Sequence, residues 1–140
     1  MLQLPRNLLK RIALFLLALF FVAAGVTHFT NPEFFVAIVP PALPAPLTLV
    51  YVSGVFEILG GLAVLWPATR AAAGVGLVLL LLAVYPANLY MAFAPERFVA
   101  QGTPLWALYA RLPVQFVFIA WAWWATRGDA AAAAPAGAAA

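Results

Sequence analysis

Long apolar stretches dominate the chain, and short segments rich in proline and polar residues separate them. The stretches do not alternate apolar and polar positions with a period of two, so β-strands are not expected. Each stretch reaches about 20 residues, the length that a helix needs to cross a hydrocarbon core of ~30 Å. The pattern therefore predicts four membrane-spanning helices, over residues 8–29, 47–66, 71–93 and 105–126.

Two of the connecting segments carry a second, shorter signal. Pro32 and Pro95 each open a segment that could form a helix, because proline is favoured in the first helical turn. The hexapeptides at 32–37 and 95–100 are identical at five of six positions. We predict short interfacial helices in these two outer loops and an extended chain over 40–46. The identity fits either a parallel repeat of two helical hairpins or two independent interfacial helices that begin with proline.

Composition supports the membrane assignment. The chain is 67% hydrophobic and 8% charged, whereas soluble domains carry about 25% charged residues and disordered chains need low hydrophobicity. The expected fold is an all-α membrane protein, a four-transmembrane-helix bundle over residues 1–127 with an Ala-rich disordered tail at 128–140. The first stretch has features of a signal peptide. Its apolar run extends to His28 and three more spans follow, so we interpret it as an uncleaved span.

Basic residues predict the orientation, because short cytoplasmic loops carry an excess of Lys and Arg. Five basic residues fall on one side of the predicted membrane: Arg6, Lys10, Arg11, Arg70 and Arg127. The opposite loops hold only Arg97. The sequence thus predicts a multi-pass protein of the cell membrane with both termini in the cytoplasm.

Several kinds of chemistry are excluded by residues that the sequence lacks. The chain has no cysteine, which removes thiolate chemistry, iron–sulfur clusters and thiol-held zinc. Its single histidine cannot supply both axial ligands of a haem. Phosphate-binding and hydrolase motifs are absent, and the seven basic residues form no continuous face for nucleic acid. We expect no metal site and no nucleic-acid partner.

Polar side chains inside the apolar stretches indicate where function could lie. A charge at the bilayer centre costs about 2.5–3.5 kcal/mol on insertion scales, so a retained one needs a partner or a role. Ser53 and Glu57 are four residues apart and share a helix face, as do Arg111 and Gln115. Most of the polar groups fall in the outer half of the predicted bundle. The candidate ligand-binding residues are His28, Ser53, Glu57, Tyr85, Asn88, Arg111 and Gln115.

Two interpretations of these residues stay open. In the first, Glu57 pairs with Arg111 across the second and fourth spans, and a polar cavity lies between spans two to four with His28 at its rim. Bends at Pro86 and Pro113 would widen it. Its aromatic walls would include Phe21, Phe56 and Tyr85. In the second interpretation, the polar groups only join helices by hydrogen bonds.

Several segments together resemble the DoxX-like family of small four-helix membrane proteins. They are Gly-Val-Thr-His-Phe at 25–29, Ser-Gly-Val-Phe-Glu-Ile-Leu-Gly-Gly at 53–61, Pro-Ala-Asn at 86–88 and Arg-Leu-Pro-Val-Gln at 111–115. The resemblance covers about residues 8–127 and implies an inner-membrane four-helix bundle. It also implies a link to quinone-dependent redox complexes, since the family takes its name from a subunit of a thiosulfate:quinone oxidoreductase. A quinone is then the candidate cofactor.

Three functions are compatible with these observations. We favour a binder of a hydrophobic ligand, a quinone or a lipid, in the outer-half pocket, acting as an accessory subunit of a redox complex. The alternative is a chaperone or scaffold subunit whose polar residues pack helices and dock a partner. The third is an enzyme with Glu57 or His28 as acid–base, although we do not expect catalysis by this chain alone. The partners considered are membrane lipid, a membrane or redox protein, and a second copy in a homodimer.

Overall fold

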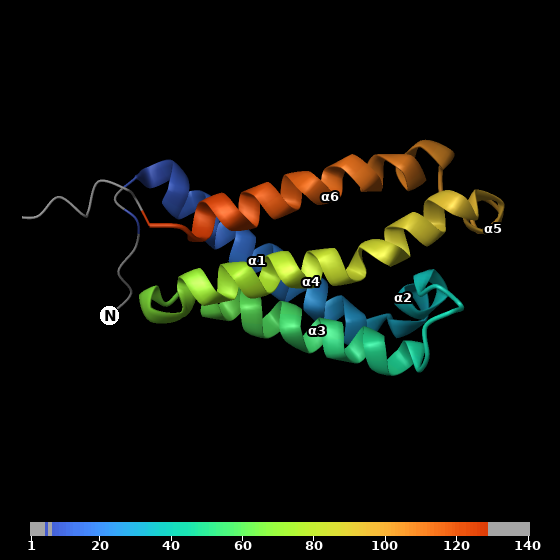
Figure 1. Cartoon of the computed structure of the whole chain (residues 1–140), viewed down its shortest axis with the longest axis horizontal. Coiled ribbons are helices and arrows are strands. Elements are labelled where there is room, and N and C mark those ends of the chain that lie inside the picture. Colours follow the sequence, from blue (N-terminus) through green and yellow to red (C-terminus); the bar gives the residue numbers. More distant parts are fainter. Residues whose placement is uncertain (1–4, 6, 129–140) are drawn as a thin grey trace, which may run out of the picture.

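The computed structural model describes residues 5 and 7–128, and this part of the chain is helical without strands. It contains α1 (Leu8–Thr30), α2 (Pro32–Ile38), α3 (Pro46–Ala63), α4 (Pro67–Phe93), α5 (Pro95–Val99) and α6 (Leu105–Thr126). Helices α1, α3, α4 and α6 are long and apolar enough to cross a membrane, as the hydropathy pattern predicts. The four long helices run roughly along the long axis of the molecule (Figure 1). The predicted Ala-rich tail, apart from Gly128, and Arg6 lie outside the described residues.

Local sequence explains where the helices begin. The Asn7 side chain caps α1 by accepting a hydrogen bond from the Leu9 backbone N–H at 2.9 Å. Proline occupies the first turn of α2, α3, α4 and α5, where its missing N–H is harmless. The predicted start of the third span at residue 71 is wrong: α4 begins four residues earlier, at Pro67, because this proline opens the helix. Helix α3 correspondingly ends at Ala63.

The segment before α3 is not extended as expected. The Leu43 backbone N–H donates to the Pro40 carbonyl at 3.0 Å, which closes a turn. Pro41 takes the second position of this turn, where its fixed φ angle is favourable. Ala45 then adopts a left-handed conformation with φ of 49° immediately before Pro46. The predicted short helices at 32–38 and 95–99 are both present.

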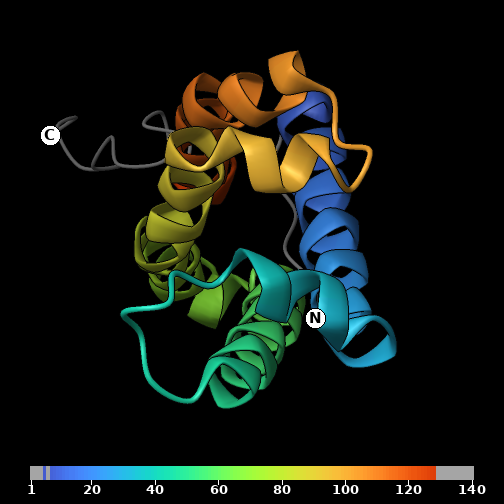
Figure 2. The same cartoon turned by 90° about the vertical axis from the view of Figure 1, so that its right-hand side faces the viewer.

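The four long helices form a ring when viewed end-on (Figure 2). Helix α1 packs on α3, α3 on α4, α4 on α6, and α6 on α1. The diagonal pairs, α1 with α4 and α3 with α6, have no close backbone contact. Packing is most extensive within the pairs α1–α3 and α4–α6. The molecule is therefore built from two hairpins. Its centre lies between the diagonal helices, which do not touch each other.

Glycines bring α1 and α3 close together. A Cβ atom on Gly25 would lie 2.6 Å from the Gly54 carbonyl oxygen, and one on Gly54 would lie 2.8 Å from the His28 Cβ. Gly61 faces the Ala18 carbonyl in the same way, at 3.0 Å. Small residues permit such close helix contacts. One consequence is that the His28 side chain reaches α3.

The apolar core fills one end of the ring, near the start of α1 and the α3–α4 connection. Its buried residues include Leu14, Leu17, Phe21, Val64, Leu77, Leu81, Ala122 and Ala125. A smaller cluster of Met91, Phe98 and Leu108 joins α4, α5 and α6 at the opposite end. Between these two clusters the ring is not closed by side chains, and a cavity results.

Candidate ligand-binding cavity

The cavity has a volume of about 970 Å³ and is lined by residues of α1, α2, α3, α4 and α6. A cavity lies among the second, third and fourth spans as expected, but it is not confined to the outer half, since its lining reaches Ala63 and Thr69 at the α3–α4 connection. Helices α1 and α2 also contribute walls. The lining is mostly aliphatic and aromatic, with a few polar side chains. Six of the candidate residues are in the wall: His28, Ser53, Glu57, Asn88, Arg111 and Gln115.

Tyr85 does not line the cavity. Its ring instead meets the ring of Phe116 on α6 edge-on, with 5.6 Å between centroids. It is three residues from Asn88, but that spacing does not bring both side chains to the cavity, and the expected wall position of Tyr85 is wrong. Phe21 and Phe56, the other two expected aromatic residues, are in the lining.

Three elements hold His28 in place. Its Nδ1 lies 2.9 Å from the Ala24 carbonyl oxygen within α1. A carbonyl oxygen can only accept, so Nδ1 carries a proton in this arrangement. The same nitrogen lies 3.3 Å from Oε2 of Glu57 on α3. The Phe35 ring of α2 stacks on the imidazole with 3.8 Å between centroids. The histidine is therefore fixed at the junction of α1, α2 and α3.

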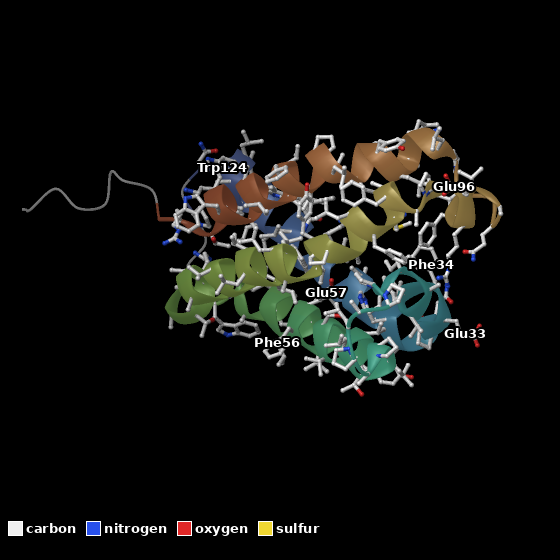
Figure 3. All side chains as sticks on the ribbon, turned by 45° about the vertical axis from the view of Figure 1, so that its right-hand side comes forward. Glu33, Phe34, Phe56, Glu57, Glu96 and Trp124 are labelled. Carbon is white, nitrogen blue, oxygen red and sulfur yellow. The ribbon has the colours of Figure 1, made fainter. Side chains whose placement is uncertain are left out.

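Glu57 is buried but incompletely satisfied. The residue is 9% exposed, and Figure 3 places it on the side of α3 that faces the other helices, whereas Phe56 lies on the outer side. The contact with His28 is within ion-pair range but is not aligned as a hydrogen bond, since Oε2 has no hydrogen-bond partner. A buried oxygen without a donor costs free energy. Oε2 is itself shielded from solvent, so a donor group in the cavity would reach this oxygen only after the neighbouring side chains move.

The expected ion pair between Glu57 and Arg111 is not formed. Glu57 contacts His28 instead, and among the described residues Arg111 makes neither an ion pair nor a hydrogen bond. The physical reason is the order of helices in the ring, because α3 and α6 lie diagonally opposite. Both side chains nevertheless line the same cavity. Arg111 is a half-buried cation on the wall facing Glu57.

Asn88 and Gln115 form a satisfied link between α4 and α6. The Asn88 Nδ2 donates to the Gln115 Oε1 at 3.0 Å, and the Gln115 Nε2 donates to the Leu81 carbonyl. Pro86 lies in the same part of α4, where its missing N–H removes the helical donor for the Leu82 carbonyl. Interhelical hydrogen bonding is therefore the role of this pair. Ser53 is satisfied too, since its hydroxyl donates to the Val50 carbonyl at 2.9 Å.

The sequence analysis missed Phe35 as a site residue. It follows His28 by seven positions and sits on α2, which folds back over the end of α1 and lines the cavity. The available signal was an aromatic side chain on a short helix that starts with proline next to the histidine. That signal does not reveal the turn direction between α1 and α2, which decides whether Phe35 faces the bundle or the outside.

Comparison with known families shows that the chain belongs to the family described as "Domain of unknown function (DUF8561)", whose model matches residues 17–126. The DoxX-like family does not match, so that resemblance is wrong and the redox role that it implied loses its basis. Small residues beside polar ones recur wherever membrane helices pack closely, which explains why such segments resemble unrelated families. No curated protein and no solved structure matches the chain.

Proposed function

We propose that the protein is a multi-pass membrane protein, a four-helix bundle that binds an amphipathic hydrophobic molecule in its central cavity. The ligand class is a lipid or a related molecule whose polar head can both donate and accept hydrogen bonds. Four helices of suitable length and hydropathy support placement in a bilayer. So do large apolar side chains on the outside, such as Leu19, Leu79 and Val117, each at least 60% exposed, because soluble proteins rarely expose so much apolar surface.

The observation that carries the proposal is the contrast between satisfied and unsatisfied polar groups in the wall. If the polar residues served only to join helices, each would have a partner inside the protein. Asn88 and Gln115 meet this requirement. Glu57 Oε2 does not, and Arg111 has no partner among the described residues. These two groups point to a ligand whose head group donates a hydrogen bond to one wall and accepts from the other.

The distribution of polarity orients such a ligand. The wall near the α3–α4 connection is made of small and aliphatic residues, among them Gly60, Ala63 and Leu77. Thr69 is the polar residue there, and its hydroxyl already donates to the Ala63 carbonyl at 2.6 Å. An apolar tail therefore fits this end, while the head fits beside Glu57 and Arg111. A few placed polar groups in an apolar cavity are typical of small-molecule sites.

The test is to find the ligand with the protein. Wild-type protein purified in mild detergent is analysed by native mass spectrometry and by organic extraction of bound molecules. We expect one bound lipid-like molecule per chain. Arg111→Leu and Glu57→Leu should each reduce its occupancy at least tenfold without loss of the folded protein.

Arg97→Leu is the matched control, because it removes the same charge outside the cavity. Arg97 donates to the Tyr90 hydroxyl at 2.8 Å and does not line the site. The Arg97→Leu variant should carry as much bound molecule per chain as the wild type. A wild-type protein without a bound molecule, or equal occupancy in all variants, would contradict the proposal and favour the scaffold role.

A further inference from the structure

We infer that the cavity exchanges its ligand sideways, through a groove between α3 and α4 that admits one chain of a membrane lipid from the surrounding bilayer. The inference rests on the proposed function for the identity of the ligand. It adds the route of entry and the source of the molecule. Three features of the cavity support it.

The first feature is that the cavity wall continues onto the outer surface. Phe56 and Leu59 of α3 and Leu79 of α4 all line the cavity, yet they are 58%, 56% and 60% exposed. Lining side chains with this much exposed surface indicate that the cavity opens to the outside between the two helices. The opening is apolar, since these three residues form its edges. It therefore faces the hydrocarbon if the helices span a membrane.

The second feature is the apolar cover at the end of the molecule near α2. The residues that α2 and the following turn contribute to the wall are all apolar: Phe35, Ile38, Val39, Pro40 and Leu43. Glu33, the charged residue of α2, is not in the lining, and Figure 3 shows it at the outer end. An entrance from water would be expected to carry polar groups. Helix α2 and the following turn thus give this end an apolar wall rather than a polar entrance.

The third feature is the shape of the groove. Helices α3 and α4 start together at their connection and separate towards α2 (Figure 1). They touch where Gly60 meets Leu77, since a Cβ on Gly60 would lie 2.5 Å from a methyl carbon of Leu77. From Leu49 to Ala63 the lining follows α3 over about 21 Å at 1.5 Å per residue. That length suits an extended hydrocarbon chain.

These features converge on Glu57. Its unpartnered carboxylate oxygen is buried in the same cavity that opens through the groove. A lipid chain lying in the groove would place a hydroxyl or amide head group beside the Glu57 side chain, and its donor would bond to Oε2 once the side chains that shield this oxygen move. The groove and the unsatisfied acceptor are therefore parts of one site.

The experiment measures which molecules reach the cavity. Because the chain has no cysteine, Ser53→Cys gives a single attachment point in the wall for a nitroxide spin label. The labelled protein is placed in nanodiscs of phosphatidylcholine and phosphatidylglycerol. Collision rates of the label are then measured with oxygen, which concentrates in hydrocarbon, and with a neutral water-soluble nickel chelate. Val117→Cys and Gln101→Cys provide the lipid-facing and water-facing references.

We expect the label at position 53 to resemble the label at 117. Its ratio of oxygen to nickel collision rates should be at least fivefold higher than the ratio for the label at 101. A second substitution, Ala83→Trp, should then reduce oxygen collisions at position 53 by at least half. Ala83 lines the cavity six residues beyond Leu77, and Ser53 lies seven residues before Gly60, so the indole would occupy the groove at the level of the label. Val84→Trp, also in the lining, gives an independent block if the first variant folds poorly. Val117→Trp on the outer face of α6 should have no effect.

Nickel access at position 53 equal to that at 101 would overturn the inference, and so would a label that neither reagent reaches or an unchanged oxygen rate in both groove-filling variants. The collision measurements need no bound ligand, so the lateral entry route and the proposed function can be refuted independently. A lateral opening without a co-purified molecule would refute only the proposed function. A co-purified molecule together with nickel access at position 53 would refute only the lateral entry route.

Discussion

The two hairpins of the ring have the same order of elements but differ in how polar groups join their long helices. In the first hairpin, α1 and α3 meet through His28 and Glu57, with a 3.3 Å contact that leaves a carboxylate oxygen without a hydrogen bond. In the second, α4 and α6 meet through Asn88 and Gln115, whose amides bond to each other and to a backbone carbonyl. One link is ionisable and incomplete, and the other is neutral and satisfied.

This difference separates two roles that the sequence alone combines. A neutral, satisfied pair contributes to helix packing and needs nothing further. An incomplete acidic pair facing a cavity is costly in the empty protein, and a ligand that donates to it would recover part of that cost. On the proposed function, the second hairpin would be the structural half of the cavity wall and the first its recognition half. Arg111 is the exception, since it faces the cavity from the second hairpin.

The largest expected effect concerns orientation, because the comparison assumes that both hairpins point the same way. Reporter domains active only outside the cytoplasm are fused after Arg70, Gly102 and Arg127. We expect activity only after Gly102, since basic residues concentrate on the other side. The difference should be all-or-none. Activity after Arg127 would show that the hairpins do not share an orientation.

The next effect tests the close contact within the first hairpin. Gly25→Val would place a side chain within 2.6–2.7 Å of the Gly54 carbonyl and Ile58. We expect a loss of about 2–3 kcal/mol in unfolding free energy, the typical cost of overpacking. Gly76→Val is the matched control, because nothing lies within 4 Å of its added Cβ. Thermal unfolding in detergent measures both variants, and equal losses would mean that the helices can separate freely.

A smaller effect distinguishes the two polar links directly. Gln115→Leu removes both hydrogen bonds of the second link and leaves the Asn88 Nδ2 without its partner on α6, so we expect a loss of about 1–2 kcal/mol. Glu57→Leu removes an oxygen that has no hydrogen bond, while the His28 Nδ1 keeps the Ala24 carbonyl. Its unfolding free energy should change by less than about 0.5 kcal/mol or rise. Similar losses in both variants would erase the distinction between the hairpins.

The smallest effect is an absence of coupling. Glu57 and Arg111 belong to diagonal helices that are not in contact. In a double-mutant cycle with Glu57→Gln and Arg111→Gln, measured by thermal unfolding of ligand-free protein, we expect additivity within about 0.3–0.5 kcal/mol. Coupling above 1 kcal/mol would show that the two charges meet across the cavity after all.

The elements of the fold are predictable from sequence because their signals are local. Apolar run length identifies the four long helices, and proline at a helix start identifies the short ones at 32–38 and 95–99. Pro67 shows the limit of this reasoning, because a proline between two apolar runs can close one helix or open the next. The turn at Pro40–Leu43 shows the same limit, since consecutive prolines permit both extended chain and turns.

The site is predictable only within single helices. The four-residue spacing correctly places Ser53 with Glu57, and Arg111 with Gln115, on faces that line one cavity. The partner of Glu57 depends instead on which helices are neighbours, and neither hydropathy nor spacing encodes that order. His28 was assigned to the rim of the cavity, yet it is the group that contacts Glu57, because Gly25 and Gly54 bring their helices together. Whether the matching hexapeptides reflect a true repeat stays a prediction, since both origins give the same two short helices.

The unequal lengths of α3 and α4 have a consequence for the membrane itself. Helix α3 has 18 residues and α4 has 27, which correspond to about 27 Å and 40 Å. A bilayer core of ~30 Å matches the first closely and is shorter than the second, so if both helices span a bilayer, α4 would tilt or the lipids beside it would thicken. Lipids along the groove would border a thin wall on one side and a thick wall on the other. Their packing would be disturbed at that line, which would lower the barrier for a single chain to leave the bilayer there.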